Sequence, residues 1–308
     1  MAHVYIRGME LAEKPNTPLC QVVLGLTLYL DDVLFWARRG AELALDAFLR
    51  RVGPDSVRWY TTSALSEWQR VSAASAAALV PHLSHAALPR PRHLFSFDLV
   101  DDAAVCTTGF TYREYDPTRG GARASILEMS FPQTGAPDRL FDVVKEISQI
   151  GPWWSGSAGF VLRWNVWKKN SALTAAYPYA KRYLGLEIQD SVDMSWRVTE
   201  ALPTVNWLTL VGKPLAGARS IDLAALATHK WVHGVSVAAI GNGGLLRAGA
   251  EPTAGDRNRL EYPSACAEVA RELAPYLVED VPELGGEFLR QKSTAAWSRR
   301  FLEPDGWQ

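Results

Sequence analysis

The 308-residue sequence contains only three cysteines, and no two of them form a C-x-x-C pair. Cys20, Cys106 and Cys266 are far apart, so the sequence predicts neither a disulfide framework nor a cysteine-based zinc site. We expect them to be small buried residues of a protein from a reducing compartment. The chain also lacks a run of about 18 apolar residues, which a membrane-spanning helix requires.

The segment MAHVYIRGMELAEKP at the start of the chain has no apolar stretch typical of a secretory signal, so we expect a cytoplasmic protein. Neither sign of charge is in excess, because the sequence has 32 basic and 33 acidic residues and a net charge of −1. Nucleic-acid binding generally needs a basic surface, so this balance argues against direct binding of DNA or RNA. The content of 48% hydrophobic and 21% charged residues is that of an ordinary globular protein.

No nucleotide-binding motif is complete. The stretch IGNGGLLRAGAEPTAGDRNRLEYP, residues 240–263, is glycine-rich and followed by arginines, which is typical of a phosphate-binding loop. It lacks the G-x-x-x-x-G-K-[ST] pattern, and no helix is expected directly after its glycines, as a dinucleotide site would require. Two β-type segments instead flank Gly241-Asn242-Gly243, which favours a β-hairpin.

Catalytic and metal-binding motifs are incomplete as well. In WSGSAGF, Ser155 stands where a nucleophile elbow has its first glycine, and a strand, not a helix, is expected after Ser157. No Asp or Glu has Lys two residues later, as in the D/E-x-K element of restriction-type nucleases. The histidine pairs 82/85 and 229/233 have helical spacing but no third ligand nearby, whereas zinc needs three or four. The sequence therefore predicts no metal and no cofactor.

Periodicity predicts both strands and helices. A continuous apolar run predicts a strand over 20–30, and the next helix should end at Gly53-Pro54. A second helix is expected over 63–80 and others near 137–150 and 221–229, with alternating strands between them. The prediction is an α/β (α+β-like) fold with a mixed, largely antiparallel sheet and packed helices. We expect one domain over 1–308, and two intertwined subdomains, 20–168 and 169–302, are the alternative.

Acidic residues and tryptophans are the remaining candidates for function. The acidic residues form three groups, which are Asp31-Asp32, Asp98 with Asp101-Asp102, and Glu279-Asp280 with Glu283 and Glu287. The first two groups lie at strand ends, where solvated acids are common, but such residues could also form an acidic contact surface or bind a divalent metal. Most of the 12 tryptophans should be buried, and a few could be exposed anchors for a partner.

Several segments, taken in order, resemble the type VI secretion immunity family. They are LGLTLYLDD, VRWYTTSALSEWQ, TVNWLTLVG, GLLRAGAEPTAGDRNR and AAWSRRF. The resemblance runs from about Cys20 to Phe301, and VNWLTL and AGAEPTAGDRN are its most specific parts. Members of this family are cytoplasmic antitoxins paired with nuclease effectors of the restriction-endonuclease fold.

The resemblance implies a protein that binds and neutralises a cognate nuclease effector, with 1:1 stoichiometry, and is not an enzyme. It implies no direct contact with nucleic acid or membrane. Acidic side chains complement the basic clefts of nucleases, so we expect toxin contacts among the acidic groups and two adjacent tryptophans. These candidates are Asp31, Asp32, Asp98, Asp101, Asp102, Glu279, Asp280, Glu283, Trp153 and Trp154. Two alternatives stay open: a metal-dependent hydrolase using Asp31, Asp32 and Asp98, and a non-catalytic adaptor of the secretion apparatus.

Overall fold

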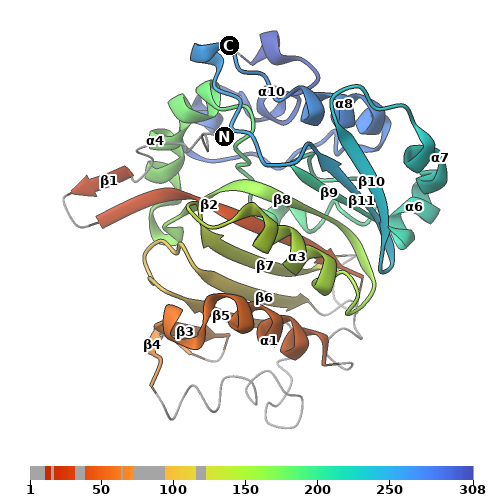
Figure 1. Cartoon of the computed structure of the whole chain (residues 1–308). Helices are drawn as coiled ribbons and strands as arrows, with labels where there is room; N and C mark the ends of the chain where they lie inside the picture. Colours follow the sequence, from red (N-terminus) through yellow and green to blue (C-terminus); the bar gives the residue numbers. More distant parts are fainter. Residues whose placement is uncertain are drawn as a thin grey trace.

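A computed structural model describes residues 11–14, 17–31, 39–63, 65–72, 94–115 and 123–307. Its strands form one sheet in the order β10-β11-β9-β8-β2-β7-β6-β5-β3-β4, with β1 added to β2, and every ladder is antiparallel (Figure 1). The strands are β1 (Leu11–Lys14), β2 (Thr17–Leu30), β3 (Trp59–Thr62), β4 (Gln69–Arg70), β5 (Leu94–Val100), β6 (Gly109–Tyr115), β7 (Ser125–Pro132), β8 (Trp153–Trp164), β9 (Leu208–Gly212), β10 (Val235–Ile240) and β11 (Gly243–Ala248). The prediction of a mixed α/β fold with a largely antiparallel sheet is confirmed.

Helices pack around this sheet, and short 3₁₀ turns follow several of the elements. The α-helices are α1 (Gly40–Val52), α3 (Pro137–Ile147), α4 (Lys169–Arg182), α5 (Ser191–Met194), α6 (Lys213–Arg219), α7 (Leu223–Thr228), α8 (Ser264–Leu273), α9 (Gly286–Arg290) and α10 (Thr294–Ser298). The 3₁₀ turns are η1 (Pro54–Ser56), η2 (Val166–Lys168), η3 (Arg257–Arg259), η4 (Ala274–Tyr276) and η5 (Pro304–Gly306). Within the described residues, no helix is both long and apolar enough to cross a membrane.

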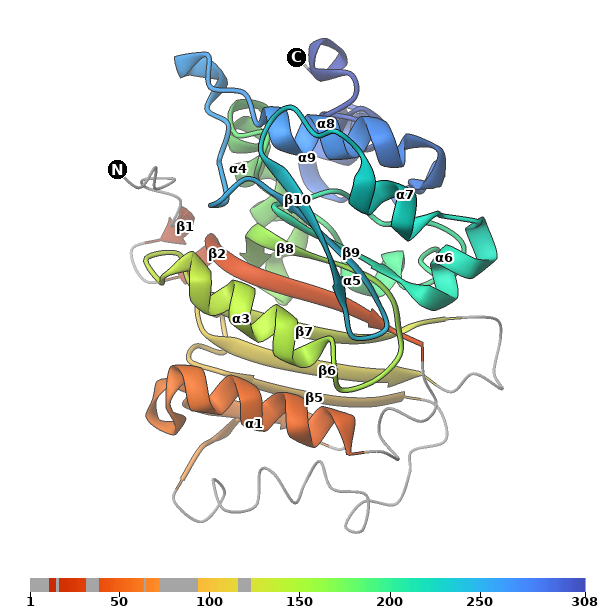
Figure 2. The ribbon, with the colours of Figure 1, turned by 45° about the vertical axis from the view of Figure 1, so that its right-hand side comes forward.

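The long strand β2 lies in the middle of the sheet, between β7 and β8. Its apolar residues are buried throughout, as the continuous run over 20–30 predicts. Leu24, Leu26 and Leu28 belong to the main core together with Phe48 of α1 and Val144 of α3. Figure 2 shows α1 and α3 lying side by side across one face of the sheet. One face of strands β5, β6, β7 and β2 is therefore apolar and covered by these two helices.

The C-terminal helices enclose a second part of the same core. Phe288, Trp297 and Trp307 pack on one another, with ring centroids 5.3 to 6.1 Å apart, and Tyr177 of α4 packs edge-on against Phe288 at 5.0 Å. Buried aromatic rings provide a large apolar contact area. The expectation that most tryptophans lie in the interior holds for Trp153, Trp207, Trp297 and Trp307, each at most 2% exposed.

The glycine-rich stretch 240–263 is structural. It contains the hairpin β10–β11, in which Ile240 pairs with Gly243 across the Gly241-Asn242 turn, as predicted. Gly241 has φ of +41°, and a Cβ there would lie 1.9 Å from the carbonyl oxygen of Ser148, so a larger residue does not fit. Farther along, the buried carboxylate of Asp256 accepts two hydrogen bonds from Arg182, at 2.9 and 2.7 Å. These bonds hold the pKa of Asp256 below its usual value.

One predicted element is wrong, and others lie outside the described residues. The helix expected over 63–80 does not begin at Ser63, because the chain turns there and Gln69–Arg70 pairs with β3 instead. Asp32, His82, His85 and the rest of that helix lie outside the described residues. The sheet continues from β8 to β9, so both predicted subdomains, 20–168 and 169–302, contribute strands to it. The division into subdomains stays a prediction.

Candidate functional site

A row of polar side chains crosses the sheet on the face opposite α1 and α3. The strand register aligns Asp98 with Thr111, Thr111 with Glu128, Glu128 with Thr27, and Thr27 with Ser157. Residues opposite each other on antiparallel strands point to the same face. Strands β5, β6, β7, β2 and β8 therefore each add one polar residue, and we call these five residues the polar row.

At one end of the polar row, Asp98 is held by two donors. The Thr111 hydroxyl donates to Oδ1 of Asp98 at 2.7 Å, and Arg113 Nη2 donates to the same oxygen at 3.3 Å. Burial raises the pKa of Asp98, because desolvation outweighs the opposing effects of Arg113 and Thr111. The negative charge on Asp98 is therefore only partly compensated within the chain.

In the middle of the row, Glu128 pairs with Arg163 from β8. Arg163 Nη1 donates to Oε1 of Glu128 at 2.6 Å, and Arg163 Nε donates to Ser130 Oγ at 2.9 Å. Thr27 donates to the same Glu128 oxygen at 3.4 Å. The pair is mostly buried, with 18% and 11% of the two side chains exposed. It fixes Arg163 in one orientation across β2.

The far end of the row joins a buried network. Ser157 donates to Oε1 of Glu187 at 3.0 Å, and the side-chain amide of Asn206 donates to Oε2 at 2.7 Å. Burial raises the pKa of Glu187. Asn206 is the asparagine of the TVNWLTLVG segment, so this part of the sequence serves internal packing.

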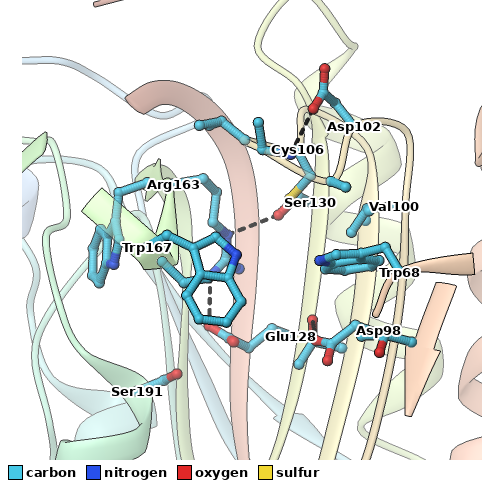
Figure 3. A pocket seen from close by; sticks show the side chains of 18 of the residues that line it. Trp68, Asp98, Val100, Asp102, Cys106, Glu128, Ser130, Arg163, Trp167 and Ser191 are labelled. Carbon is cyan, nitrogen blue, oxygen red and sulfur yellow. Dashed lines mark hydrogen bonds and ion pairs between the residues drawn. The ribbon is translucent and has the colours of Figure 1, made fainter. Parts of the chain in front are cut away.

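A pocket with a volume of about 420 Å³ opens over the Asp98 and Glu128 end of the row. In Figure 3, the Asp98 and Glu128 side chains lie side by side, and the rings of Trp68 and Trp167 lie above them in the view. We call this cavity the Trp167 pocket. Its lining includes five carboxylates and two guanidinium groups, which are Glu67, Asp98, Asp102, Glu128 and Asp190, and Arg113 and Arg163.

Trp167 lies at the edge of this pocket on the 3₁₀ turn η2, directly after β8. The Asn165 side chain accepts a hydrogen bond from the backbone N–H of Trp167 at 3.0 Å, which caps the turn. Trp167 is 82% exposed and its neighbour Val166 is 64% exposed. Exposed apolar side chains grouped beside a pocket are typical of a protein interaction site.

The acids of the 98–102 group have different roles. Asp98 and Asp102 line the pocket, whereas Asp101 does not. Oδ1 of Asp101 accepts the backbone N–H of Asp102 at 2.9 Å and of Thr107 at 3.0 Å. Asp101 thus shapes the loop after β5, and Asp102 is exposed on that loop.

Asp31 lies away from this site. It is half-buried at the end of β2, where its backbone N–H donates to the carbonyl of Pro152 at 3.2 Å, and burial raises its pKa. Thr27, four residues before Asp31, is aligned with Asp98 three strands away, so the standard spacings put the two Cα atoms roughly 20 Å apart. Asp31 and Asp98 cannot bind one metal ion. Among the described residues, no group of three or more His, Cys, Asp or Glu is arranged to hold a metal.

The acids of the C-terminal group do not line the pocket. Asp280 pairs with Arg197 at 2.7 Å, Glu283 accepts from Thr294 at 3.0 Å, and Glu279 is exposed. A small second cavity of about 30 Å³ joins this segment, at Val281 and Pro282, to Gln189 and Asp190, which also line the Trp167 pocket.

The two tryptophans predicted as contacts do not lie at this pocket. Trp153 is completely buried, and its indole N–H donates to the carbonyl of Ser148 at 3.2 Å. Trp154 is half-buried against the core. Trp153 is therefore an interior residue that no partner could reach.

The sequence analysis did not select Trp68, Glu128, Arg163 or Trp167. A charged residue within an otherwise apolar strand was the available signal for Glu128 and Arg163, because a charge with apolar neighbours indicates a polar sheet face. For Trp167, the signal was Asn165 two residues earlier, since asparagine commonly caps turns that place the next side chains in solvent.

Comparisons with known proteins agree on family and fold. Residues 42–301 match the model of the family TsiV, described as type VI immunity for VRR-NUC. The chain is also similar in structure to the Pseudomonas aeruginosa T6SS protein PA0821, with a TM-score of 0.78 and 18% sequence identity over 94% of this chain and 88% of that chain. At this identity the likeness concerns the fold. No match was found among curated proteins.

Proposed function

Because the chain belongs to the family of type VI immunity proteins for VRR-NUC, we propose that it binds the VRR-NUC domain of its cognate effector in a 1:1 complex. Binding would neutralise the effector by covering its active site or its nucleic-acid-binding surface. The chain itself would contribute no catalytic group, no metal and no contact with nucleic acid.

The observation that carries this proposal is the exposure of Trp167 beside a preformed pocket. Tryptophan is enriched among the residues that dominate binding energy, and these residues lie near recessed, desolvated pockets. Val166 extends the same apolar surface, and Leu65, 38% exposed, lines the pocket as well. Rigid strands form the floor, so binding would order few additional side chains.

The charge of the pocket supports a nuclease as the partner. Nucleases bind phosphate groups and therefore present basic surfaces. The pocket lining has five carboxylates against two guanidinium groups. Opposite charges on the two proteins would accelerate association and exclude partners of the same sign.

The proposed absence of catalysis is tested with the purified protein. Asp31 and Asp98 lie on different parts of the sheet, so these two acids of the hydrolase alternative do not share a metal site. We expect no cleavage of plasmid DNA or of RNA with Mg²⁺ or Mn²⁺. Metal-dependent cleavage that is lost in Asp98→Asn would support the hydrolase instead.

The proposed place of action is the cytoplasm, because a nuclease effector damages the cell where its nucleic-acid substrate is found. Cell fractionation should find the complex with cytoplasmic markers. Recovery of the protein mainly with periplasmic markers would contradict this location.

The main test is inhibition by titration. The cognate VRR-NUC domain should lose its nuclease activity in proportion to added protein and be fully inhibited at about one equivalent. Unchanged activity at a large excess would contradict the proposal. Co-purification with sheath or spike components, without binding to the effector, would support the adaptor alternative.

A further inference from the structure

Resting on the proposed function, we propose that the Trp167 pocket receives one basic side chain, arginine or lysine, from a surface loop of the VRR-NUC effector. The cation would lie above Asp98 and Glu128 and between the rings of Trp68 and Trp167. The contacts, the charge and the shape of the pocket indicate this occupant.

The carboxylates in the pocket have unused hydrogen-bond acceptors. Both hydrogen bonds to Asp98 end on Oδ1, and both to Glu128 end on Oε1. Among the residues that the structure describes, none donates a hydrogen bond to the second oxygen of either carboxylate. Each residue is 9% exposed, so about nine-tenths of it is buried. Both residues line the pocket, so a partner can donate to these second oxygens, and a cationic donor forms the stronger bond.

The pocket lining carries more negative than positive groups. The lining has five carboxylates and two guanidinium groups, and one of the carboxylates, Asp190, is paired with Lys169 at 2.6 Å, so two carboxylates remain in excess. The raised pKa of Asp98 agrees with this, since Arg113 does not offset the cost of its burial. An added cation near Asp98 would favour the ionised carboxylate.

The rings of Trp68 and Trp167 line the pocket. Tryptophan is the best aromatic partner for a guanidinium or ammonium group. The aliphatic stem of arginine or lysine would pack on Trp167 and Val166 near the rim. A volume of about 420 Å³ is within the range of ligand pockets and accommodates a long side chain with part of its loop.

The guanidinium groups of the pocket do not favour an acidic occupant. An incoming carboxylate would need free donors in the floor of the pocket. The two guanidinium nitrogens without a partner, Nε of Arg113 and Nη2 of Arg163, are themselves buried and not available at the surface. Nη2 of Arg113 already donates to Asp98, and Nη1 and Nε of Arg163 donate to Glu128 and Ser130.

The experiment is a double-mutant cycle measured by titration calorimetry. Each surface Lys and Arg of the effector domain is replaced by Ala and titrated against wild type and Asp98→Asn. Replacing one of these basic residues should lower the affinity of the effector for the wild-type protein about 30-fold or more, as expected for a buried charge pair. The same replacement should lower the affinity for Asp98→Asn less than about threefold, because the partner charge is already removed.

Matched variants separate the pocket from other surfaces. Asp305→Asn changes an exposed acid outside the pocket and should bind like wild type. If Asp98→Asn does not fold, Trp167→Ala and Asp102→Asn serve in its place, since both side chains are exposed. Asn at position 98 keeps the Oδ1 acceptor, so we expect it to fold.

The outcomes distinguish the two proposals. If wild type does not bind the effector, the proposed function is wrong. If wild type binds but Asp98→Asn, Asp102→Asn and Trp167→Ala bind equally well, the pocket is not the contact site. If the pocket variants lose affinity but couple only to an acidic or apolar effector residue, the basic occupant is wrong.

Discussion

The two faces of the sheet are built from the same strands but have opposite chemistry. In β7, Leu127 and Met129 point into the core under α1 and α3, whereas Glu128 and Ser130 line the pocket on the other side. In β6, Phe110 is in the core and Thr111 is in the polar row. Alternation along a strand lets one segment provide stability on one face and recognition on the other.

This difference indicates where mutations should affect folding and where they should affect binding. Residues of the helix-covered face contact other parts of the same chain. Those of the pocket face end at a cavity with an exposed aromatic rim. We therefore expect mutations on the helix-covered face to lower the stability strongly. Mutations on the pocket face should lower it less, and least at the rim.

The largest expected loss of stability is for Phe110→Ala. Phe110 is completely buried, with ring centroids 5.9 Å from Phe48 and 6.3 Å from Phe97. Removing such a ring typically costs about 3–5 kcal/mol of unfolding free energy. Urea denaturation of the isolated protein measures this loss, and a loss below about 1 kcal/mol would contradict the assignment of this face to the core.

A smaller loss is expected for Arg163→Met on the pocket face. The change removes two hydrogen bonds and leaves Glu128 without its cationic partner. Hydrogen bonds to charged groups contribute about 1.5–3 kcal/mol, so we expect a loss of that order in urea denaturation. Adding Glu128→Gln should restore part of it, because the unpaired charge is then removed. The control Arg299→Met breaks an exposed pair with Glu303 and should stay close to wild type.

Asp98 should make the contribution of the pocket face to the unfolding free energy depend on pH, whereas the apolar face has no such titrating group among its described residues. The pKa of Asp98 is raised above its ordinary 3.8, so above that pH the folded protein keeps a proton that the unfolded chain has lost. The contribution of Asp98 to unfolding free energy thus decreases as pH rises from about 4 through the folded-state pKa, and then stays constant.

Urea denaturation of wild type and Asp98→Asn over about pH 4 to 7 isolates this effect. The stability of wild type relative to the variant should fall with increasing pH. Acids with lowered pKa, such as Asp256, produce the opposite trend in both proteins, so they cancel in the difference. A relative stability that increases with pH would show that Asp98 is fully compensated by Arg113.

The smallest effect on stability is expected at the rim. Trp167 is 82% exposed, so Trp167→Ala should change unfolding free energy by less than about 0.5 kcal/mol. Thermal and urea denaturation should coincide with wild type. A larger loss would mean that Trp167 packs within the chain and is not an anchor for a partner.

Local sequence patterns predicted the elements better than the pocket. The strand over 20–30, the helix stop at Gly53-Pro54 and the hairpin at Gly241-Asn242 all follow from short-range signals, and the structure confirms them. The helix predicted over 63–80 was wrong in its first, described part, because an edge pairing with β3 replaces it at Gln69–Arg70. Such pairing depends on a distant strand and not on local propensity.

The pocket depends on long-range register. Asp98 and Glu128 share one face, on either side of Thr111, because β5, β6 and β7 pair in one register, which a single sequence does not specify. The sequence did select Asp98 and Asp102 as acids at a strand end, and both line the pocket. It chose Trp153 and not Trp167, because composition alone does not show which of 12 tryptophans is buried.

The most direct test of an anchor at the pocket rim is calorimetric titration of the VRR-NUC domain into wild type, Trp167→Ala and Leu260→Ala. Leu260 is 93% exposed and lies outside the pocket lining, so it is the matched control for an exposed apolar side chain. Truncation of a dominant interface residue costs at least about 2 kcal/mol, which is about 30-fold in affinity. We expect that loss for Trp167→Ala and wild-type affinity for Leu260→Ala. Equal affinity of Trp167→Ala and wild type, or a loss confined to Leu260→Ala, would contradict binding at the Trp167 pocket.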